Sequence, residues 1–311
     1  MDFITAKQAA EKWGISDRQV RIICAAGKIK DARRAGRAWL IPADVPKPED
    51  GRVSRFRNNK LNELLFRIDE KRAVLDNLRP LTSGEVARLK DEFLVEFTYN
   101  SNAIEGNTLT LQETAMVLEG MTIDRKPLKD HLEVIGHRDA FEYMLQLVQE
   151  KVPLSERVIK EIHSLVLNDR PEDRGVYRRI PVRIMGAKHE PPQPYLVPVQ
   201  MEKFITRHEE MAKTMHPVEQ VALFHLLFEE IHPFIDGNGR TGRLLLNFEL
   251  SSAGFPAINI KFTDRRKYYD CFSSYYETGS HEQMTLLVGG YVEEMLDRYL
   301  KILKNTNKKS I

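Results

Sequence analysis

The chain has 311 residues, of which 42% are hydrophobic and 30% charged, as in an ordinary globular protein with a true core, and about two domains are expected. Its net charge is only +2, which excludes a polycationic nucleic-acid-binding protein and requires any such surface to be local. Two distant cysteines, an N-terminus without a secretion signal and no apolar run long enough for a bilayer predict a cytoplasmic protein without a membrane partner.

The first 45 residues predict a small module of two helices and a wing. A capping hydroxyl precedes, and a glycine follows, each of two helical segments, 6–13 and 17–26. Residues 28–41 then carry five basic residues and one acid around a central glycine, which predicts a two-stranded basic wing. We therefore expect one small domain over residues 1–45.

This module resembles a winged helix-turn-helix of the excisionase/MerR kind. The resemblance implies DNA as a partner of residues 1–45, with phosphate contacts from Arg18 and Arg21 on the second helix and from Arg33, Arg34 and Arg37 in the wing. The charge of residues 1–50 is modest, because ten Lys and Arg minus seven Asp and Glu give +3. A docking or oligomerisation element of the same shape is the alternative.

Beyond residue 42 the chain changes character. Three prolines and a glycine lie between residues 42 and 51 and exclude regular structure, so residues 46–59 are expected to form a linker. The body, 60–311, then shows apolar residues at helical spacing in several segments, among them 155–168, 218–231 and 283–303. The predicted fold class is therefore mainly α.

One segment of the body departs from the helical pattern. In Tyr177–Val199, Val182 and Ile184 alternate with other residues, Gly186 marks a turn, and a run of prolines follows. These features predict a short, proline-stiffened β-hairpin at the surface. On these residues alone, an ordinary surface hairpin is the simplest interpretation.

The strongest chemical signal is the segment His232-Pro-Phe-Ile-Asp-Gly-Asn-Gly-Arg-Thr-Gly-Arg243. A buried helix ends at Ile231 and an apolar helix begins near Arg240, so a glycine-containing loop leads into a helix N-terminus. Free N–H groups at such a terminus, together with the helix dipole, bind anions. The glycines at 237 and 239 let the backbone approach a phosphate without a Cβ in the way.

The charged side chains of this segment suit a nucleotide. Arg240 and Arg243 lie three residues apart on one helix face, which suits a polyphosphate. Asp236 offers a hard oxygen ligand for Mg²⁺, and His232 could take a proton near neutral pH. Each feature alone has an ordinary structural explanation, but their convergence in one short segment indicates a nucleotide site.

The segment resembles the motif of the Fic family, His-Pro-Phe-x-Asp/Glu-Gly-Asn-Gly-Arg-x-x-Arg, and every fixed position is matched. The resemblance extends over about residues 90–290 and implies a helical Fic (Fido) fold with a core over about 110–295. It also implies an enzyme, a protein adenylyltransferase. Such a nucleotidyltransferase moves AMP from ATP to a Ser, Thr or Tyr hydroxyl of a target protein or of itself, and releases pyrophosphate.

Residue roles follow from the same resemblance. His232 would be the general base, and Asp236 would hold Mg²⁺ against the phosphates of ATP. The phosphate-binding positions that it implies are Gly237, Asn238, Gly239, Arg240, Thr241, Gly242 and Arg243. Doc-type kinases of the family have Lys where this chain has Gly239, so Gly239 favours nucleotidyl transfer.

Two further segments match positions near the nucleotide in this family. The hairpin expected over Tyr177–Val199 resembles the flap, whose edge aligns a target by strand addition. The flap stretch that covers the nucleotide is matched by Met185, Gly186 and Ala187. The adenine pocket is matched by Tyr268, Tyr269 and Tyr276, although Asn is frequent in the family at the last position. Core packing is the competing interpretation for these tyrosines.

An inhibitory element is also expected. Ser101-Asn-Ala-Ile-Glu105-Gly106 matches the family's inhibitory pattern Ser/Thr-x-x-x-Glu-Gly/Asn, in a helix over about 92–107. By resemblance, Glu105 pairs with Arg243, the arginine that should hold the terminal phosphate of ATP. We therefore expect autoinhibition, with a simple helix-capping Glu as the alternative. In some family members this Glu also positions water to remove AMP, which is a further hypothesis for Glu105.

Two alternatives compete with an ATP-dependent adenylyltransferase. The chain could be a DNA-binding regulator in which the Fic body serves as a nucleotide sensor, although the intact His232 argues against an inactive body. The donor could also be UTP, GTP or a phosphocholine nucleotide. Self-association is frequent in the family, so a homo-oligomer is a further expectation.

Overall fold

The computed structural model describes residues 3–25, 27, 29, 31–36, 38–46, 51–78, 80, 82–184 and 189–307, with only the backbone for 51–59 and 305–307. The chain divides into two compact units, Met1–Lys60 and Leu61–Ile311. Within the described residues, we find no helix that is both long and apolar enough to cross a membrane.

The N-terminal unit contains the two predicted helices and the predicted hairpin. Its elements are β1 (Phe3–Thr5), α1 (Ala6–Trp13), α2 (Asp17–Ala25), β2 (Arg33–Ala35) and β3 (Ala38–Pro42). Thr5 caps α1 in a capping box with Gln8, and Gly14 ends that helix in the left-handed conformation. The sheet has the antiparallel order β1-β3-β2, so β1 adds a strand that was not predicted. Lys28, Lys30 and Arg37 of the expected wing lie outside the described residues.

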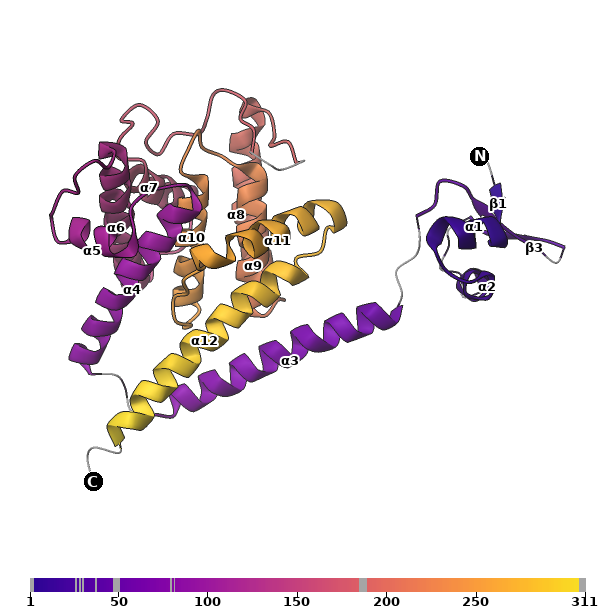
Figure 1. The fold of residues 1–311 in the computed structure, drawn as a ribbon, viewed down its shortest axis with the longest axis horizontal. Helices are drawn as coiled ribbons and strands as arrows, with labels where there is room; N and C mark the ends of the chain where they lie inside the picture. Colours follow the sequence, from indigo (N-terminus) through magenta and orange to yellow (C-terminus); the bar gives the residue numbers. More distant parts are fainter. Residues whose placement is uncertain are drawn as a thin grey trace. The chain divides into compact units, whose positions relative to one another are not determined.

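The second unit is helical, as expected (Figure 1). Its helices are α3 (Gly51–Asp76), α4 (Ser83–Ile104), α5 (Leu111–Leu118), α6 (Leu128–Gln149), α7 (Glu156–Val166), α8 (Val197–Met211), α9 (Pro217–Ile231), α10 (Asn238–Ser252), α11 (Arg265–Thr278) and α12 (Glu282–Asn307). Two 3₁₀ turns, Pro194–Leu196 and Phe262–Asp264, precede α8 and α11.

The helix α3 begins inside the stretch that we expected to be linker. Residues 51–59 are helical, so the prediction of a linker over 46–59 is wrong for its second half. The prolines that suggested a linker all precede Gly51, and no further proline occurs before Pro80. The helix can therefore start as soon as the last of these breakers is passed.

The helix α9 lies between two apolar clusters. Phe224 and Phe228 on one side pack with residues of α4, α6, α7, α8 and α10. Val221 and Leu226 on the other side pack with α3, α11 and α12. A helix that is apolar all round must be buried, as the sequence predicted for this segment. In Figure 1, α10 lies next to α9, with α6 and α7 on its other side.

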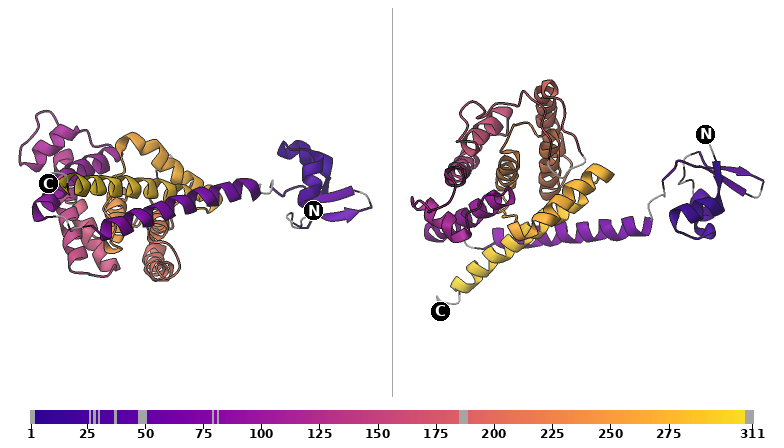
Figure 2. Two further views of the ribbon diagram at one scale, coloured as in Figure 1. Left: turned by 90° about the horizontal axis from the view of Figure 1, so that it is seen from below. Right: turned by 45° about the horizontal axis from the view of Figure 1, so that its top comes forward.

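The C-terminal helix α12 packs along the part of α3 that belongs to the body (Figure 2). Arg67 and Lys71 on α3 both bond to Glu293 on α12, at 2.9 and 3.0 Å. Lys71 also reaches Asp297 at 2.7 Å. Beneath these ion pairs, Leu64 and Ile68 pack into the second apolar cluster, so burial provides most of the stability of this contact.

The β-hairpin expected over Tyr177–Val199 is not found among the described residues of that segment. Residues 177–184 form no regular element, and α8 already starts at Val197. Pro198 lies in the first turn of α8, where a missing N–H leaves no helical bond unmade, so this proline starts a helix instead of preventing one. The expected nucleotide-covering residues Met185, Gly186 and Ala187 lie outside the described residues.

Candidate active site

The loop between α9 and α10 begins with an unusual backbone conformation. His232 has left-handed angles, φ 48° and ψ 62°, and its N–H donates to the carbonyl of Phe228 at 3.0 Å, which ends α9. Such angles are uncommon for residues other than glycine and cluster at functional sites. The imidazole is 20% exposed and therefore accessible from the surface.

The loop is braced by its own side chains. The amide group of Asn238 donates to the Phe234 carbonyl and accepts from the Phe234 N–H, both at 2.9 Å. We expected Asn238 to receive phosphate oxygens, but its side chain is instead buried inside the loop. Gly237, with φ 76°, turns the chain into α10, and the free N–H groups of the first turn of α10 are what the loop offers an anion.

His163, on α7, contacts the loop between α9 and α10 and holds it in place. Its Nδ1 accepts from the N–H of Gly175 at 3.0 Å, so its Nε2 carries the proton and donates to the carbonyl of Asp236 at 3.0 Å. The ring stacks on Phe234 with 3.6 Å between centroids. Burial lowers the pKa of His163 to about 4, so it is neutral at neutral pH. Sequence reasoning missed this residue, although a histidine on the buried face of a predicted helix was the signal.

Arg178 fixes the end of α9. Its side chain is buried and donates to the carbonyl of His232 at 2.9 Å and to that of Pro192. Its own N–H donates to the carbonyl of Pro233 at 3.0 Å. Burial lowers the pKa of the Arg178 guanidinium. The residue thereby satisfies carbonyls that the helix end leaves free and ties the segment after Tyr177 to the loop.

Arg243 is paired with the predicted inhibitory segment. Its guanidinium is 2% exposed, and Nη1 lies 2.9 Å from Oε1 of Glu105. Nε donates to the hydroxyl of Ser101 at 3.0 Å, and Nη2 donates to the Ser101 carbonyl at 2.7 Å. Burial acts to lower the pKa of Arg243, but Glu105 and Tyr268 together outweigh it and the pKa is raised. The expected pair of Glu105 and Arg243 is thus present.

Gly239 lies directly under the carboxylate of Glu105. A Cβ at this position would collide with Oε1 of Glu105 and would come within 3.1 Å of Nη1 of Arg243. The absence of a side chain at 239 is therefore what lets Glu105 reach Arg243. The sequence suggested that glycine at 239 lets the backbone approach a phosphate. The structure shows that it also leaves room for the carboxylate of Glu105.

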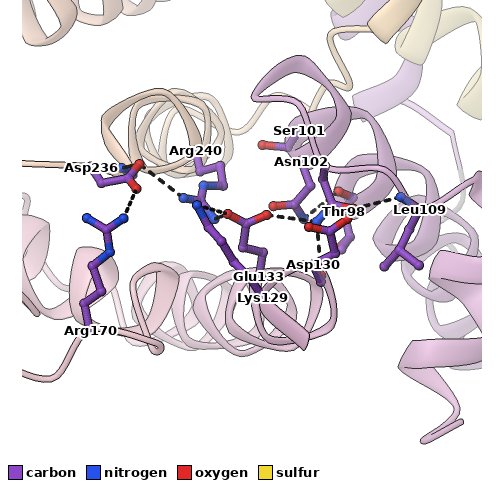
Figure 3. Close-up of polar contacts among 12 residues, drawn as sticks. Thr98, Ser101, Asn102, Leu109, Lys129, Asp130, Glu133, Arg170, Asp236 and Arg240 are labelled. Atoms are coloured by element: carbon purple, nitrogen blue, oxygen red, sulfur yellow. Dashed lines mark hydrogen bonds and ion pairs between the residues drawn. The ribbon is translucent and has the colours of Figure 1, made fainter. Parts of the chain in front are cut away.

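Arg240 is held by carboxylates. Its guanidinium is 3% exposed, with Nη1 at 3.2 Å from Glu133 and Nη2 at 3.6 Å from Asp236. Figure 3 shows Arg240 between these two residues, with Arg170 reaching the other oxygen of Asp236 at 3.4 Å. Glu133 also accepts from the side chain of Asn107 at 2.9 Å. The two motif arginines therefore have different partners, because Arg243 faces α4 whereas Arg240 faces α6.

Asp236 keeps the properties of a cation ligand. Burial acts to raise its pKa, but the guanidinium of Arg240 and the N–H of Gly237 outweigh this and lower the pKa, so the carboxylate is ionised at neutral pH. Its side chain is 34% exposed. Among the described residues, no three His, Cys, Asp or Glu side chains converge as a ready-made metal site. One carboxylate beside a phosphate site is nevertheless a common arrangement for Mg²⁺, which takes its other ligands from phosphates and water.

Glu229 is a further carboxylate near the loop. Sequence reasoning did not single it out. It lies on α9 one turn before His232, and its Oε2 is 3.4 Å from Nδ1 of His232. Burial acts to raise the pKa of Glu229, but the nearby His232 and other cationic groups lower it. A carboxylate on the buried face of an apolar helix was the available signal.

The three tyrosines expected at the adenine pocket have different environments. Tyr268 is buried, and its hydroxyl bonds to Nε2 of His225 at 2.7 Å, so it is a core residue as the competing interpretation held. Tyr269 is 39% exposed, with its hydroxyl 3.5 Å from the carbonyl of Ile104. Tyr276 stacks on His189 at 4.4 Å between centroids. Tyr269 is therefore the most exposed of the three, whereas Tyr276 is only partly exposed.

Comparison with known proteins gives the family. Residues 153–250 match the model of the Fic/DOC family. Two curated relatives are both named protein adenylyltransferase Fic. The one from Drosophila yakuba is 36% identical over 236 residues, which are 75% of this chain and 47% of that protein. The one from Nematostella vectensis is 37% identical over 245 residues, 76% of this chain and 56% of that protein. The chain thus spans about half the length of these curated relatives.

Solved structures agree with this assignment. A Fic domain containing signaling protein from Bacteroides thetaiotaomicron is 30% identical, with a TM-score of 0.70 over 77% of this chain and 97% of that chain. Fic-1 from C. elegans (residues 134–508) is 29% identical, with a TM-score of 0.74 over 82% of this chain and 76% of that chain. The mainly α Fic fold that the sequence predicted is thereby confirmed. On its sequence, its loop and its fold, the chain belongs to the Fic/DOC family.

Proposed function

We propose that this protein is a protein adenylyltransferase that moves AMP from ATP to a hydroxyl of a target protein and is held inactive at rest by Glu105. The observation that carries the proposal is the loop between α9 and α10, where the accessible His232 stands beside an anion-binding helix N-terminus. Relatives that bear the name protein adenylyltransferase, and that share 36% of aligned residues, support the same reaction.

The chemistry follows from this arrangement. His232 takes the proton of the acceptor hydroxyl, whose oxygen then forms a bond to the α-phosphorus of ATP. The bond from that phosphorus to the β-bridging oxygen breaks, and pyrophosphate leaves with the electron pair. Asp236 is the residue that would hold Mg²⁺, which supplies positive charge to the phosphates. The N–H groups of α10 and the guanidinium of Arg243 stabilise the charge that develops on the leaving phosphates.

Glu105 opposes this reaction because it occupies a phosphate-binding group. A carboxylate and a phosphate compete for the same guanidinium fork, and Glu105 already lies 2.9 Å from Arg243. ATP would then have to bind without its terminal phosphate on Arg243, which leaves the α-phosphate out of line with the acceptor. We therefore propose low activity in the resting protein.

The proposal is tested with isotopically labelled ATP. Protein with the Glu105→Gly substitution is incubated with ATP labelled in the α- or the γ-phosphate. Transfer of AMP predicts protein-bound label from the α-phosphate only. The additional substitution His232→Ala should abolish labelling, whereas His281→Ala, at a histidine before α12, should not. Label from the γ-phosphate would show a kinase, and no label from either would contradict the proposal.

The donor nucleotide is tested in the same assay. Tyr269 is the most exposed of the three tyrosines matched to the adenine pocket, and a ring can stack on any base. ATP is therefore proposed on the names of the relatives and not on a base-specific contact. Competition by unlabelled ATP, GTP, UTP and CDP-choline measures the preference. We expect ATP to compete best, and stronger competition by another nucleotide would reassign the donor.

A further inference from the structure

Nδ1 of His232 needs a polar partner. This nitrogen is buried from solvent and has no hydrogen bond within the described residues. Water therefore cannot satisfy it, and a buried polar atom without a partner costs about 1–3 kcal/mol. The atom that faces it is Oε2 of Glu229, at 3.4 Å, longer than a normal hydrogen bond and within ion-pair distance. Hydrogen bonds at catalytic groups are often long until the reactants are bound.

Glu229, like the imidazole atom that it faces, is largely buried. Its side chain is 10% exposed, and its Oε1 also has no hydrogen bond within the described residues. Its position is fixed by close packing of α9 on α10, because a Cβ at Gly242 would stand only 2.5 Å from Oε1. The carboxylate therefore has little freedom to turn away from His232.

The other groups around Glu229 leave His232 as its partner. His225, one turn earlier on α9, is neutral at neutral pH because burial lowers its pKa to about 4. Arg243, on α10, is bound to Glu105 and Ser101. The neighbouring carboxylate Glu230 accepts from the hydroxyl of Tyr275 at 3.4 Å. A buried carboxylate is stabilised by a proton-bearing group, and the imidazole of His232 lies within ion-pair distance of Oε2.

We propose that Glu229 is a positioning residue that fixes the protonation of the catalytic histidine. It accepts the proton of Nδ1, so the neutral ring carries its free electron pair on Nε2, and Nε2 is the atom that takes the acceptor hydroxyl's proton. When that proton arrives, the ring becomes cationic and the carboxylate beside it balances the charge. In a neutral histidine, the hydrogen bond made by one ring nitrogen decides which of the two nitrogens carries the proton. This inference rests on the proposed role of His232 as the base.

The first test reads the tautomer directly and needs no transfer activity. The ¹⁵N resonances of the His232 imidazole, assigned by their absence in His232→Ala, are recorded where the ring is neutral. The unsubstituted protein should show the proton on Nδ1. Glu229→Met, which removes the acceptor but keeps an unbranched side chain, should lose this preference. Glu229→Gln keeps an acceptor oxygen and should retain it. The same tautomer in the Met variant and the unsubstituted protein would overturn the proposal.

The second test separates the charge of Glu229 from its acceptor oxygen. In the Glu105→Gly background, Glu229→Gln should lower kcat at least 10-fold and leave KM for ATP within about 2-fold, since the lost charge matters only when the ring becomes cationic. Glu230→Gln is the matched control and should leave kcat unchanged. A kcat within 2-fold of the parent, or an effect confined to KM, would count against a positioning role. Glu229→Gln changes one atom of a buried side chain, so this test remains if Glu229→Met does not fold.

The two tests distinguish an error in the proposed reaction from an error in the proposed role of Glu229. If no variant transfers label from ATP, the proposed reaction is wrong, but the resonances still report whether Glu229 sets the tautomer of His232. If transfer occurs and neither the tautomer nor kcat depends on Glu229, the reaction stands and the positioning role is wrong.

Discussion

At the scale of single residues, Arg243 is the residue on which the proposed regulation depends. It is buried, cationic and bound at three points by Ser101 and Glu105 of the proposed inhibitory segment. Only one of these contacts is to a charged group, because the Ser101 hydroxyl and carbonyl are neutral. A phosphate that displaces Glu105 from Arg243 can therefore leave the two hydrogen bonds between Arg243 and Ser101 unchanged.

Replacement of Glu105 by Gly should raise automodification with labelled ATP by at least about 10-fold, since this corresponds to about 1.4 kcal/mol of lost competition for Arg243. Ser101→Ala removes only the hydroxyl contact and should have a much smaller effect. Thermal unfolding in the presence of ATP gives an independent measurement, and the Tm increase caused by ATP should be larger for Glu105→Gly. Equal rates for Glu105→Gly and the unsubstituted protein would show that Glu105 does not restrain the site.

The sequence predicted the residues of the loop better than their partners. His232, Gly237 and Arg243 could be located because their chemistry lies in one short segment. The carboxylates near the motif, Glu133 beside Arg240 and Glu229 beside His232, were not located. Each lies in a helical pattern, and its partner depends on which helix packs against it. Local patterns contain no information on that packing.

At the scale of elements, three helices present a buried histidine to α10 or to the loop before it. His137 on α6 lies near Arg240 and Arg243, His163 on α7 bonds to the loop, and His225 on α9 packs against Gly242. Burial lowers the pKa of each, to about 4 for His163 and His225. Neutral rings at these positions add polar contacts without adding charge beside two arginines.

These histidines should make the fold sensitive to acid. Below pH 6.5, the ordinary value, His225 takes a proton in the unfolded chain but stays neutral in the folded one down to about pH 4. The free energy of unfolding should therefore fall as pH drops through this window, by about 1.4 kcal/mol per pH unit for each such histidine, and level off below it. Urea unfolding between pH 6 and 5 measures this slope.

A matched pair of variants tests whether His225 contributes to the slope of the unfolding free energy against pH. His225→Gln cannot take a proton and should reduce the slope by about one proton's contribution, roughly 1.4 kcal/mol per pH unit. His281→Gln removes a histidine that is partly exposed and should leave the slope nearly unchanged. The same slope in both variants would rule out His225 as a source of acid sensitivity.

Some of the elements were predictable, and two of the misses are informative. Apolar spacing located α7, α9 and α12, because burial of a helix face leaves a pattern in the sequence. The prolines of 191–198 were interpreted as excluding a helix, whereas Pro198 starts α8. The start of α3 was placed too late because its first turns are polar and carry no apolar pattern at helical spacing.

At the scale of the whole molecule, the chain joins a Fic body to a separate N-terminal unit. That unit has its own apolar core, which includes Trp13, Val20 and Ile41. Its described arginines, Arg18, Arg21, Arg33 and Arg34, are all exposed, and Arg21 also forms an ion pair with Asp17 at 2.7 Å. Exposed arginines on a small folded unit are consistent with the predicted DNA partner.

DNA binding by the full chain should be strongly dependent on salt. Replacement of Arg18, Arg33 and Arg34 by Gln should weaken binding to duplex DNA and reduce the slope of log K against log salt by about 3, since each phosphate contact contributes about 0.9. Arg88→Gln, at an exposed arginine of α4, is the control and should not change the slope. If the unsubstituted chain does not bind duplex DNA at about 50 mM salt, where phosphate contacts are strong, the unit serves protein docking or self-association instead.

The close approach of Glu105 to Gly239 has a consequence for substitutions at this position. Any substitution there places a carbon where the carboxylate of Glu105 now lies. Under the proposed restraint, a single codon change at 239 would release the enzyme and alter its phosphate loop in one step. Gly239 is therefore as much a part of the proposed restraint as Glu105, although the two residues lie far apart in the sequence.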